Sequence, residues 1–420
     1  MYQAESSGFV LRGPAAIRPR SGLRVSRNVV LLGVTSLLTD VSAEMVAAVL
    51  PIYVVLALGA SPLQYGLVDG MYQGGAALVR LAGGVLADRW RRYKELAALG
   101  YGVSAACKAG LIAVGASVGG VSAIILADRF GKGIRTAPRD ALISLSSARD
   151  RLASSFGVHR AMDTAGAMLG PLAAFAVLLA APGAFGAVFA VSLCFAILGL
   201  AVLLLFVENR APRPTSGRPA RAGLRHTLGL LGLPAFRRLV VVGALLGLVT
   251  ISDGFLYLGL QRRVDFGTAL FPLLFAGSAL AYMALAVPVG LLADRVGRGR
   301  VFLAGYLLLL LVYTALVLPD LGAAALIAYL PLIGAYYAAT DGVLMAAASA
   351  ALPEQQRGGG LGLLLAATTL AKLVAAVAFG LLWTTLGLEV AAMAFGAGLA
   401  MALAAAALVL ARGEGRMACA

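Results

Sequence analysis

The sequence contains few charged residues and few of the residues that usually perform catalysis or bind metals. Only 13% of its residues are charged and 7% are aromatic, and it has three cysteines and two histidines. A soluble domain has about 25% charged residues, so a soluble globular protein is excluded. The cysteines are scattered without a disulfide or metal-ligand spacing, and no Ser-His-Asp or carboxylate-metal arrangement is visible. We therefore expect no enzyme, no catalytic residue, no cofactor and no resident metal.

Apolar residues dominate the chain instead. They make up 61% of its 420 residues, and the mean hydropathy is +0.92. One membrane crossing needs about 20 apolar residues, so the sequence predicts an all-α membrane protein with twelve transmembrane helices. The expected spans are 28–50, 63–87, 95–117, 119–141, 155–181, 184–207, 238–260, 268–292, 301–318, 322–350, 359–385 and 388–411.

The basic residues indicate how the chain is oriented. The net charge is +15, but the lysines and arginines cluster in short breaks between apolar runs. With both termini inside, and with Arg238 at the edge of the seventh span counted with the linker, 24 of them lie in cytoplasmic segments and two, Arg262 and Arg263, lie outside. This follows the positive-inside rule and argues against a nucleic-acid partner. The expected parts are a cytosolic tail (1–27), a six-helix bundle (28–207), a cytosolic linker (208–237), a second six-helix bundle (238–411) and a cytosolic tail (412–420).

The two halves repeat a short motif. "GGVLADRWRRYK" (83–94) follows the second span and "VGLLADRVGRGR" (289–300) follows the eighth, so "LADR" recurs 206 residues later. Asp40 in the first span has Asp253 in the seventh as a rough counterpart. Duplicated six-helix halves are typical of transporters, with the binding site near the midplane between them.

Over nearly its whole length the chain resembles a transporter of the major facilitator superfamily. The second copy of the loop motif, Gly290 to Arg300, matches the family pattern Gly-x-Leu-Ala-Asp-Arg-x-Gly-Arg-x-Arg/Lys, whereas the first has Arg91 where a glycine is usual. The resemblance implies two pseudo-symmetric bundles around a central cavity, and a loop that latches them in the outward-facing state. The residues implied for this gating motif are Gly84, Asp88, Arg89, Arg92, Arg139, Gly290, Asp294 and Arg295.

The fourth span carries four cations, at 129, 132, 135 and 139. They are three or four residues apart, so they form one stripe on a helix and cannot face lipid. The run "GKGIRT" lacks the spacing of a phosphate-binding loop, and we reject a nucleotide site. Arg129 with Gly133 resembles the family's fourth-span motif, whose arginine is associated with proton transfer. Arg135 and Arg139 are candidate partners of Asp88. The alternative is that all four cations only neutralise nearby acids.

The fifth span contains a cluster of titratable residues and, after it, a glycine and proline pattern that can bend the helix. His159 and Asp163 share a helix face, and Arg160 is placed to pair with Asp163. Small residues allow close helix approach. A Gly-x-x-x-Gly-Pro pattern, which resembles that of family antiporters and favours exchange or efflux, is formed by Gly166, Gly170 and Pro171.

Asp40 and Glu44 lie one helical turn apart in the first span. A charged side chain inside a membrane is costly, about 3 kcal/mol on insertion scales, and marks a functional position by default. We expect one of the two to bind a proton and thereby to loosen pairing with Arg129 or Arg160, which shifts the inward/outward equilibrium. A static ion network is the alternative. These acids with His159, Met162 and Asp163 could also form a divalent-metal site.

The sequence thus predicts a secondary transporter for a small organic solute, proton-coupled and with efflux by antiport preferred. The rivals are uptake of an anionic metabolite or metal chelate, divalent-metal transport, and a sensor on a transporter fold. We expect a monomer in the lipid bilayer of the plasma (inner) membrane, with both termini cytoplasmic. The proton and substrate-coupling candidates are Asp40, Glu44, Arg129, His159, Arg160 and Asp163. The cavity candidates are Lys132, Asp253, Tyr257, Tyr336, Asp341 and Lys372, and Tyr337 is a further aromatic candidate.

Overall fold

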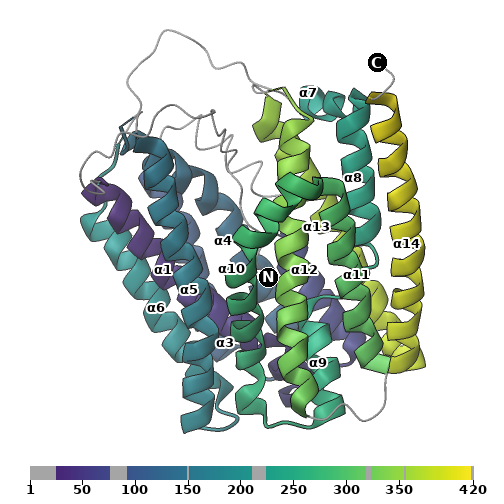
Figure 1. Cartoon of the computed structure of the whole chain (residues 1–420). Coiled ribbons are helices and arrows are strands. Elements are labelled where there is room, and N and C mark those ends of the chain that lie inside the picture. Colours follow the sequence, from purple (N-terminus) through teal and green to yellow (C-terminus); the bar gives the residue numbers. More distant parts are fainter. Residues whose placement is uncertain are drawn as a thin grey trace.

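The computed structural model shows α-helices joined by short connections and no strand among the residues that it describes (Figure 1). The described residues are 25–75, 92–148, 151–210, 224–317, 323–353 and 356–417. The N-terminal half contains α1 (Arg27–Ile52), the π-helical turn η1 (Tyr53–Ala57), a helix over residues 62–75, α3 (Tyr93–Ala113), α4 (Val118–Leu145), α5 (Leu152–Ala180) and α6 (Phe185–Phe206).

The C-terminal half is built in the same way from long apolar helices. It contains α7 (Leu224–Gly229), η3 (Leu230–Gly232), α8 (Pro234–Gly247), α9 (Asp253–Val264), η4 (Thr268–Leu270), α10 (Phe271–Val296), α11 (Arg298–Val317), α12 (Ala323–Ala350), α13 (Arg357–Leu386) and α14 (Leu388–Met417).

Local sequence sets several helix ends. The Ser26 and Ser117 hydroxyls accept hydrogen bonds from backbone N–H groups in the first turns of α1 and α4, as N-cap side chains do. Gly297 ends α10 with φ +110° and Gly387 ends α13 with φ +89°. Only glycine adopts such angles without steric cost, so these two residues fix where the following helices begin.

One end of the molecule carries the connection between the halves, and we call it the linker end. Figure 1 shows α7 and the C-terminal end of α14 there. The start of α1 lies at this end too, because the Asn28 amide donates to the Ser146 hydroxyl at 2.7 Å and to the Glu208 carbonyl at 3.3 Å. Residues 58–61 and η4 lie at the opposite end.

Charged side chains are inside the molecule and many apolar ones are outside. Lys108 and Asp128 are each 3% exposed, whereas Leu205 is 74% exposed and Val287 is 70% exposed. This is the reverse of a water-soluble protein, and it suits a protein whose outer surface meets acyl chains. In the described part of the chain, eight helices are long and apolar enough to cross a membrane.

The expected continuous seventh span, 238–260, is wrong in one respect. The chain leaves the helix after Gly247 and re-enters it at Asp253, which separates α8 from α9. The Tyr313 hydroxyl of α11 accepts from the Ile251 N–H at 2.6 Å and donates to the Val249 carbonyl at 3.0 Å. Backbone groups in a membrane need such partners, so Tyr313 stabilises the interruption.

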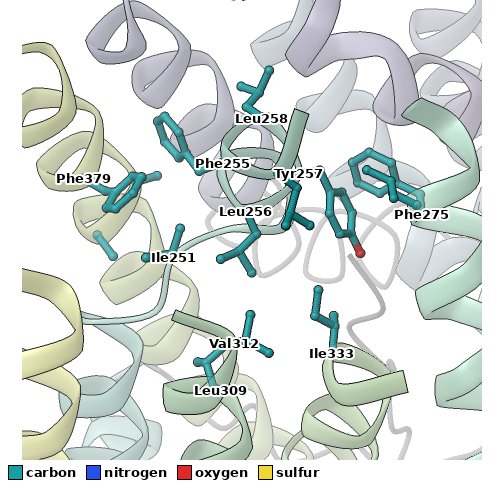
Figure 2. Packing of buried hydrophobic residues seen from close by; sticks show 14 of the residues in the cluster. Ile251, Phe255, Leu256, Tyr257, Leu258, Phe275, Leu309, Val312, Ile333 and Phe379 are labelled. Atoms are coloured by element: carbon teal, nitrogen blue, oxygen red, sulfur yellow. The ribbon is translucent and has the colours of Figure 1, made fainter. Parts of the chain in front are cut away.

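Aromatic and branched residues of α9 form the centre of the apolar core. Figure 2 shows Phe255 near Phe379 of α13, and Tyr257 beside Phe275 of α10. The ring centroids of these two pairs are 5.0 and 4.7 Å apart, with edge-to-face geometry, which is a favoured arrangement for aromatic pairs. The short helix α9 is thereby held between α10 and α13, and its first residue, Asp253, contacts Tyr337 of α12.

Candidate functional site

A buried charged triad links α3 to α4. The Lys108 ammonium donates to Asp128 Oδ1 at 2.6 Å, and the Arg129 guanidinium pairs with the other carboxylate oxygen. The three side chains are 4–5% exposed. The Arg129 guanidinium also lies 4.0 Å from the centre of the Tyr72 ring, a cation–π distance. Arg129 thus connects the triad to the helix over residues 62–75.

A second buried network lies nearer to the linker end. The Arg135 guanidinium donates to the Ser104 hydroxyl at 2.8 Å and lies 4.6 Å from the Tyr101 ring centre. One turn further along α4, Arg139 pairs with Asp140 at 3.0 Å and approaches Asp163 at 3.9 Å. The cation stripe predicted for the fourth span therefore points into the bundle.

Ser36, His159 and Asp163 come together in this network, although no Ser-His-Asp arrangement was visible in the sequence. The Ser36 oxygen lies 2.9 Å from His159 Nε2, and His159 Nδ1 lies 3.5 Å from Asp163 Oδ2. Arg160 Nη1 is 3.9 Å from the same carboxylate oxygen. Ser36 and His159 are each 1% exposed, so an acyl substrate has no access to the hydroxyl. The arrangement suits proton sharing better than nucleophilic attack.

Asp40 and Glu44 are half-buried on α1, facing α5. Neither forms a hydrogen bond or an ion pair with another of the described residues. Asp40 lies within electrostatic reach of Lys132, Arg135 and Arg139, and Glu44 lies within reach of Lys132 and Arg129. In this conformation Arg129 pairs with Asp128 and Arg160 with Asp163, so the expected direct pairing with Asp40 or Glu44 is absent.

Two glycines of α5 allow this helix to pack closely against the part of α1 that carries Asp40 and Glu44. A Cβ added to Gly166 would lie 2.5 Å from the Leu37 carbonyl oxygen and 3.1 Å from Asp40 Cβ. A Cβ added to Gly170 would lie 2.7 Å from Glu44 Cβ. Pro171 follows within α5. The bend pattern therefore lies directly against the stretch of α1 that carries the two carboxyl groups.

The C-terminal half contributes a smaller polar group around the α8–α9 interruption. The Tyr337 hydroxyl donates to Asp253 Oδ1 at 2.6 Å, and the Tyr257 hydroxyl donates to the Ser278 hydroxyl at 2.7 Å. Tyr257 and Tyr336 are 0% and 2% exposed and pack in the core. Asp253 and Tyr337 are the members of this group that line a small hollow.

Three small hollows are lined by buried charged residues. Two of them are both lined by Asp341 and Lys372. A third is lined by Asp253 and also by Asp69. Asp69 was not among the predicted site residues. Its spacing from other charged residues gave no signal, because its neighbours in space belong to the other half.

The first gating motif lies mostly outside the described residues, since Gly84, Asp88 and Arg89 fall there. Arg92 is exposed immediately before α3. In the second copy, Asp294 accepts hydrogen bonds from Arg298 at 2.9 and 3.1 Å. Arg298 also donates to the Ala346 carbonyl of α12, so the motif ties the α10–α11 turn to α12. Gly290 lies in α10, and Arg295 is exposed near its end.

Comparison with known sequences decides the family. Residues 32–276 and 254–417 match the Major Facilitator Superfamily. The chain belongs to this superfamily. An uncharacterized MFS-type transporter of Methanocaldococcus jannaschii is 31% identical over 368 residues, which are 86% of this chain and 89% of the relative. An uncharacterized protein of Mycobacterium tuberculosis is 33% identical over 198 residues, or 47% of each chain. The resemblance inferred from the loop motifs is confirmed.

Solved transporter structures share the fold. The nucleoside transporter NupG superposes with a TM-score of 0.75 at 14% identity, covering 91% of this chain and 99% of that one. A POT family transporter in complex with a thioalcohol-conjugated peptide gives 0.76 at 15% identity, with 93% and 96% covered. At such low identity these structures inform on the fold alone. Membership of the superfamily makes the protein a multi-pass membrane transporter for a small molecule.

The described residues of this transporter contain no group of three or more His, Cys, Asp or Glu side chains that could hold a metal ion. Met162, which we considered with His159 and Asp163 as a ligand, places its sulfur against Gly33 of α1.

Proposed function

We propose that the protein is a proton-coupled secondary transporter that works by alternating access, with antiport and efflux of an organic solute as its direction. Two six-helix bundles, 28–207 and 238–411, supply twelve spans, and the linker (208–237) and both tails face the cytoplasm. The excess of 24 cytoplasmic lysines and arginines over two external ones supports this orientation. The plasma membrane is the proposed location and a monomer the proposed state.

In this scheme the structure represents an inward-facing state. The contacts between the halves gather toward the end opposite the linker. The Leu63 N–H donates to the Thr384 hydroxyl at 2.9 Å, and a Cβ added to Gly66 would lie 2.5 Å from the Ala376 carbonyl oxygen. Glycine at such points lets backbones approach closely. The helix over residues 62–75 and α13 thus form the external closure of the proposed inward-facing state.

The observation that carries proton coupling is the state of Asp40 and Glu44. Both carboxyl groups are half-buried inside the bundle, and neither has an ion-pair partner among the described residues. Intramembrane acids that are not neutralised by a direct partner are natural proton sites. Protonation changes their attraction to Lys132 of α4, which lies within electrostatic reach of both. Because Gly166 and Gly170 seat α5 on the same stretch of α1, this change acts where the two helices pack most closely.

Proton binding at these two residues can be tested without knowing the substrate. Infrared difference spectroscopy of the purified protein across neutral pH reports protonated carboxyl groups. We expect a carboxyl signal that shrinks in Asp40→Asn, in Glu44→Gln, or in both. Glu389→Gln is a suitable control, because Glu389 is an exposed acid that pairs with Arg263 at 2.8 Å. If both variants keep the full signal, proton coupling through this pair is wrong.

A second candidate function is uptake of an anionic metabolite or metal chelate. It is favoured by Lys132, a half-buried cation of α4 that has no ion-pair partner among the described residues. The two functions predict opposite responses to an imposed pH gradient in oriented vesicles. Antiport predicts expulsion of an organic solute toward the acidic side, whereas anion uptake predicts accumulation of labelled anions that is lost in Lys132→Gln.

A further inference from the structure

The start of α9 is covered by side chains from the N-terminal half. Gly254, the second residue of α9, lies where Pro51 of α1 and Tyr65 of the helix over residues 62–75 meet. A Cβ added to Gly254 would overlap the Tyr65 hydroxyl oxygen, and it would lie 2.9 Å from the ring carbon that bears this oxygen and 3.1 Å from Pro51 Cγ. The two halves therefore touch at the point where the chain re-enters the helix after the interruption of the seventh span.

Aromatic packing holds Tyr65 in this position. Its side chain is 2% exposed, and its ring meets that of Phe255 edge to face, with the centroids 4.8 Å apart. Phe255 is held in turn by Phe379 of α13, with a centroid distance of 5.0 Å (Figure 2). Because protein interiors are close-packed, a side chain at position 254 is accommodated only if the helix over residues 62–75 moves away from α9.

The next turn of the same helix adds a polar contact. Asp69 follows Tyr65 by four residues, so the two side chains lie on one face of the helix. The Asp69 carboxyl is within hydrogen-bonding reach of the Ser252 hydroxyl and of the Tyr65 hydroxyl. Ser252 is the N-cap residue of α9, but its hydroxyl makes no capping hydrogen bond, which leaves it available to Asp69. Tyr65 and Asp69 thus both contact the start of α9 from the other half.

We propose that Tyr65 and Asp69 form a lock on the start of α9, and that this lock holds the transporter closed at the end opposite the linker. Opening at that end separates the helix over residues 62–75 from α9, which frees Tyr65 from Gly254 and exposes the Asp69 and Ser252 side chains to water. The lock acts through shape and hydrogen bonding rather than through net charge. This inference rests on the proposed alternating access and adds the residues that set its equilibrium.

The lock predicts an effect of side-chain size at position 254. Gly254→Ala adds a methyl group that has no room in the closed form, so it should raise the ratio of outward- to inward-facing protein about tenfold or more, as overpacking of one form does. The ratio is read without a substrate, from the rate at which an impermeant thiol reagent labels Gln73→Cys in right-side-out vesicles of a variant without native cysteines. Gly259→Ala is the matched control. A Cβ there would lie 2.7 Å from Leu316 Cδ2, which belongs to the same half, so it overpacks both forms alike and should leave the ratio nearly unchanged.

A second background shows whether the Tyr65 side chain is the cause. In protein that carries Tyr65→Leu, Gly254→Ala should no longer raise external labelling, because the atoms that the methyl group would overlap are gone. The polar contact is tested separately. Ser252→Ala and Asp69→Ala should each raise external labelling about three- to tenfold through the lost hydrogen bond. Asp69→Asn keeps an oxygen that accepts hydrogen bonds, so it should label close to the wild-type rate.

Unchanged external labelling in Gly254→Ala overturns the lock, and so does an equal rise in the Tyr65→Leu background or in Gly259→Ala. If Gly254→Ala aggregates in gel filtration, the polar variants decide, and wild-type labelling in both Ser252→Ala and Asp69→Ala overturns the lock. A protein that labels from both sides but does not respond to these variants loses the lock and keeps alternating access. Labelling from one side only, in the wild type and in every variant, removes the proposed alternating access itself.

Discussion

At the scale of single residues, the buried triad of Lys108, Asp128 and Arg129 predicts which of two variants is the less stable to unfolding. Asp128→Asn leaves two cations facing each other at positions that are 4–5% exposed. Leaving a buried charge uncompensated costs about 3–5 kcal/mol. Lys108→Met keeps Asp128 paired with Arg129 and should cost clearly less. Thermal unfolding in detergent checks this order, and an equal loss in the two variants would show that the triad does not carry the charge balance.

The sequence shows which polar residues lie inside the membrane-spanning helices. It does not show which residues they contact. Spacing on one helix correctly placed Arg129, Arg135 and Arg139 toward the interior and brought His159 near Asp163. The contacts of Ser36 with His159 join positions 123 residues apart, and Asp69 meets residues of the other half. Such pairs depend on how helices pack against one another, which period and hydropathy do not encode.

At the scale of helices, the close packing of α1 on α5 predicts that a larger side chain at their contact lowers the stability of the protein. A Cβ at position 170 would lie 2.8 Å from the Val41 carbonyl oxygen and 3.0 Å from the Met45 nitrogen, both backbone atoms. Gly170→Ala should therefore force the helices apart and cost about 1–3 kcal/mol, as overpacking does. Gly157→Ala on the same helix is the control, because nothing lies within 4 Å of its Cβ. If the two variants have the same unfolding midpoint, this view of the interface is wrong.

Among the described residues, helix positions follow hydropathy well, and the interruption of the expected seventh span has a tertiary cause. The long apolar runs coincide with helices, and glycines with positive φ mark the ends of α10 and α13. The interruption between α8 and α9 was not predicted, because Val249, Thr250 and Ile251 continue the apolar run. Tyr313, more than 60 residues away, supplies the hydrogen bonds that make the interruption affordable in a membrane.

For the whole molecule, the proposed cycle requires the contacts opposite the linker end to open. In a variant without native cysteines, we expect Leu63→Cys with Thr384→Cys to be linked readily by a short bifunctional thiol reagent. The hydrogen bond from the Leu63 N–H to the Thr384 hydroxyl shows that these two segments of the chain are in contact. The link should hold the protein inward-facing and stop exchange across the membrane.

The state of the transporter can be followed in the same protein through a third cysteine, Gln73→Cys, because Gln73 lines two of the hollows. The first pair is linked, and an impermeant thiol reagent is then added from either side. Labelling should persist from the cytoplasmic side in inside-out vesicles and vanish from the external side in right-side-out vesicles, whereas single-cysteine controls should label from both. If linked protein still labels from outside, then residues 62–75 and α13 do not form the external gate, and rocking of the two halves about the central acids cannot be the transport motion.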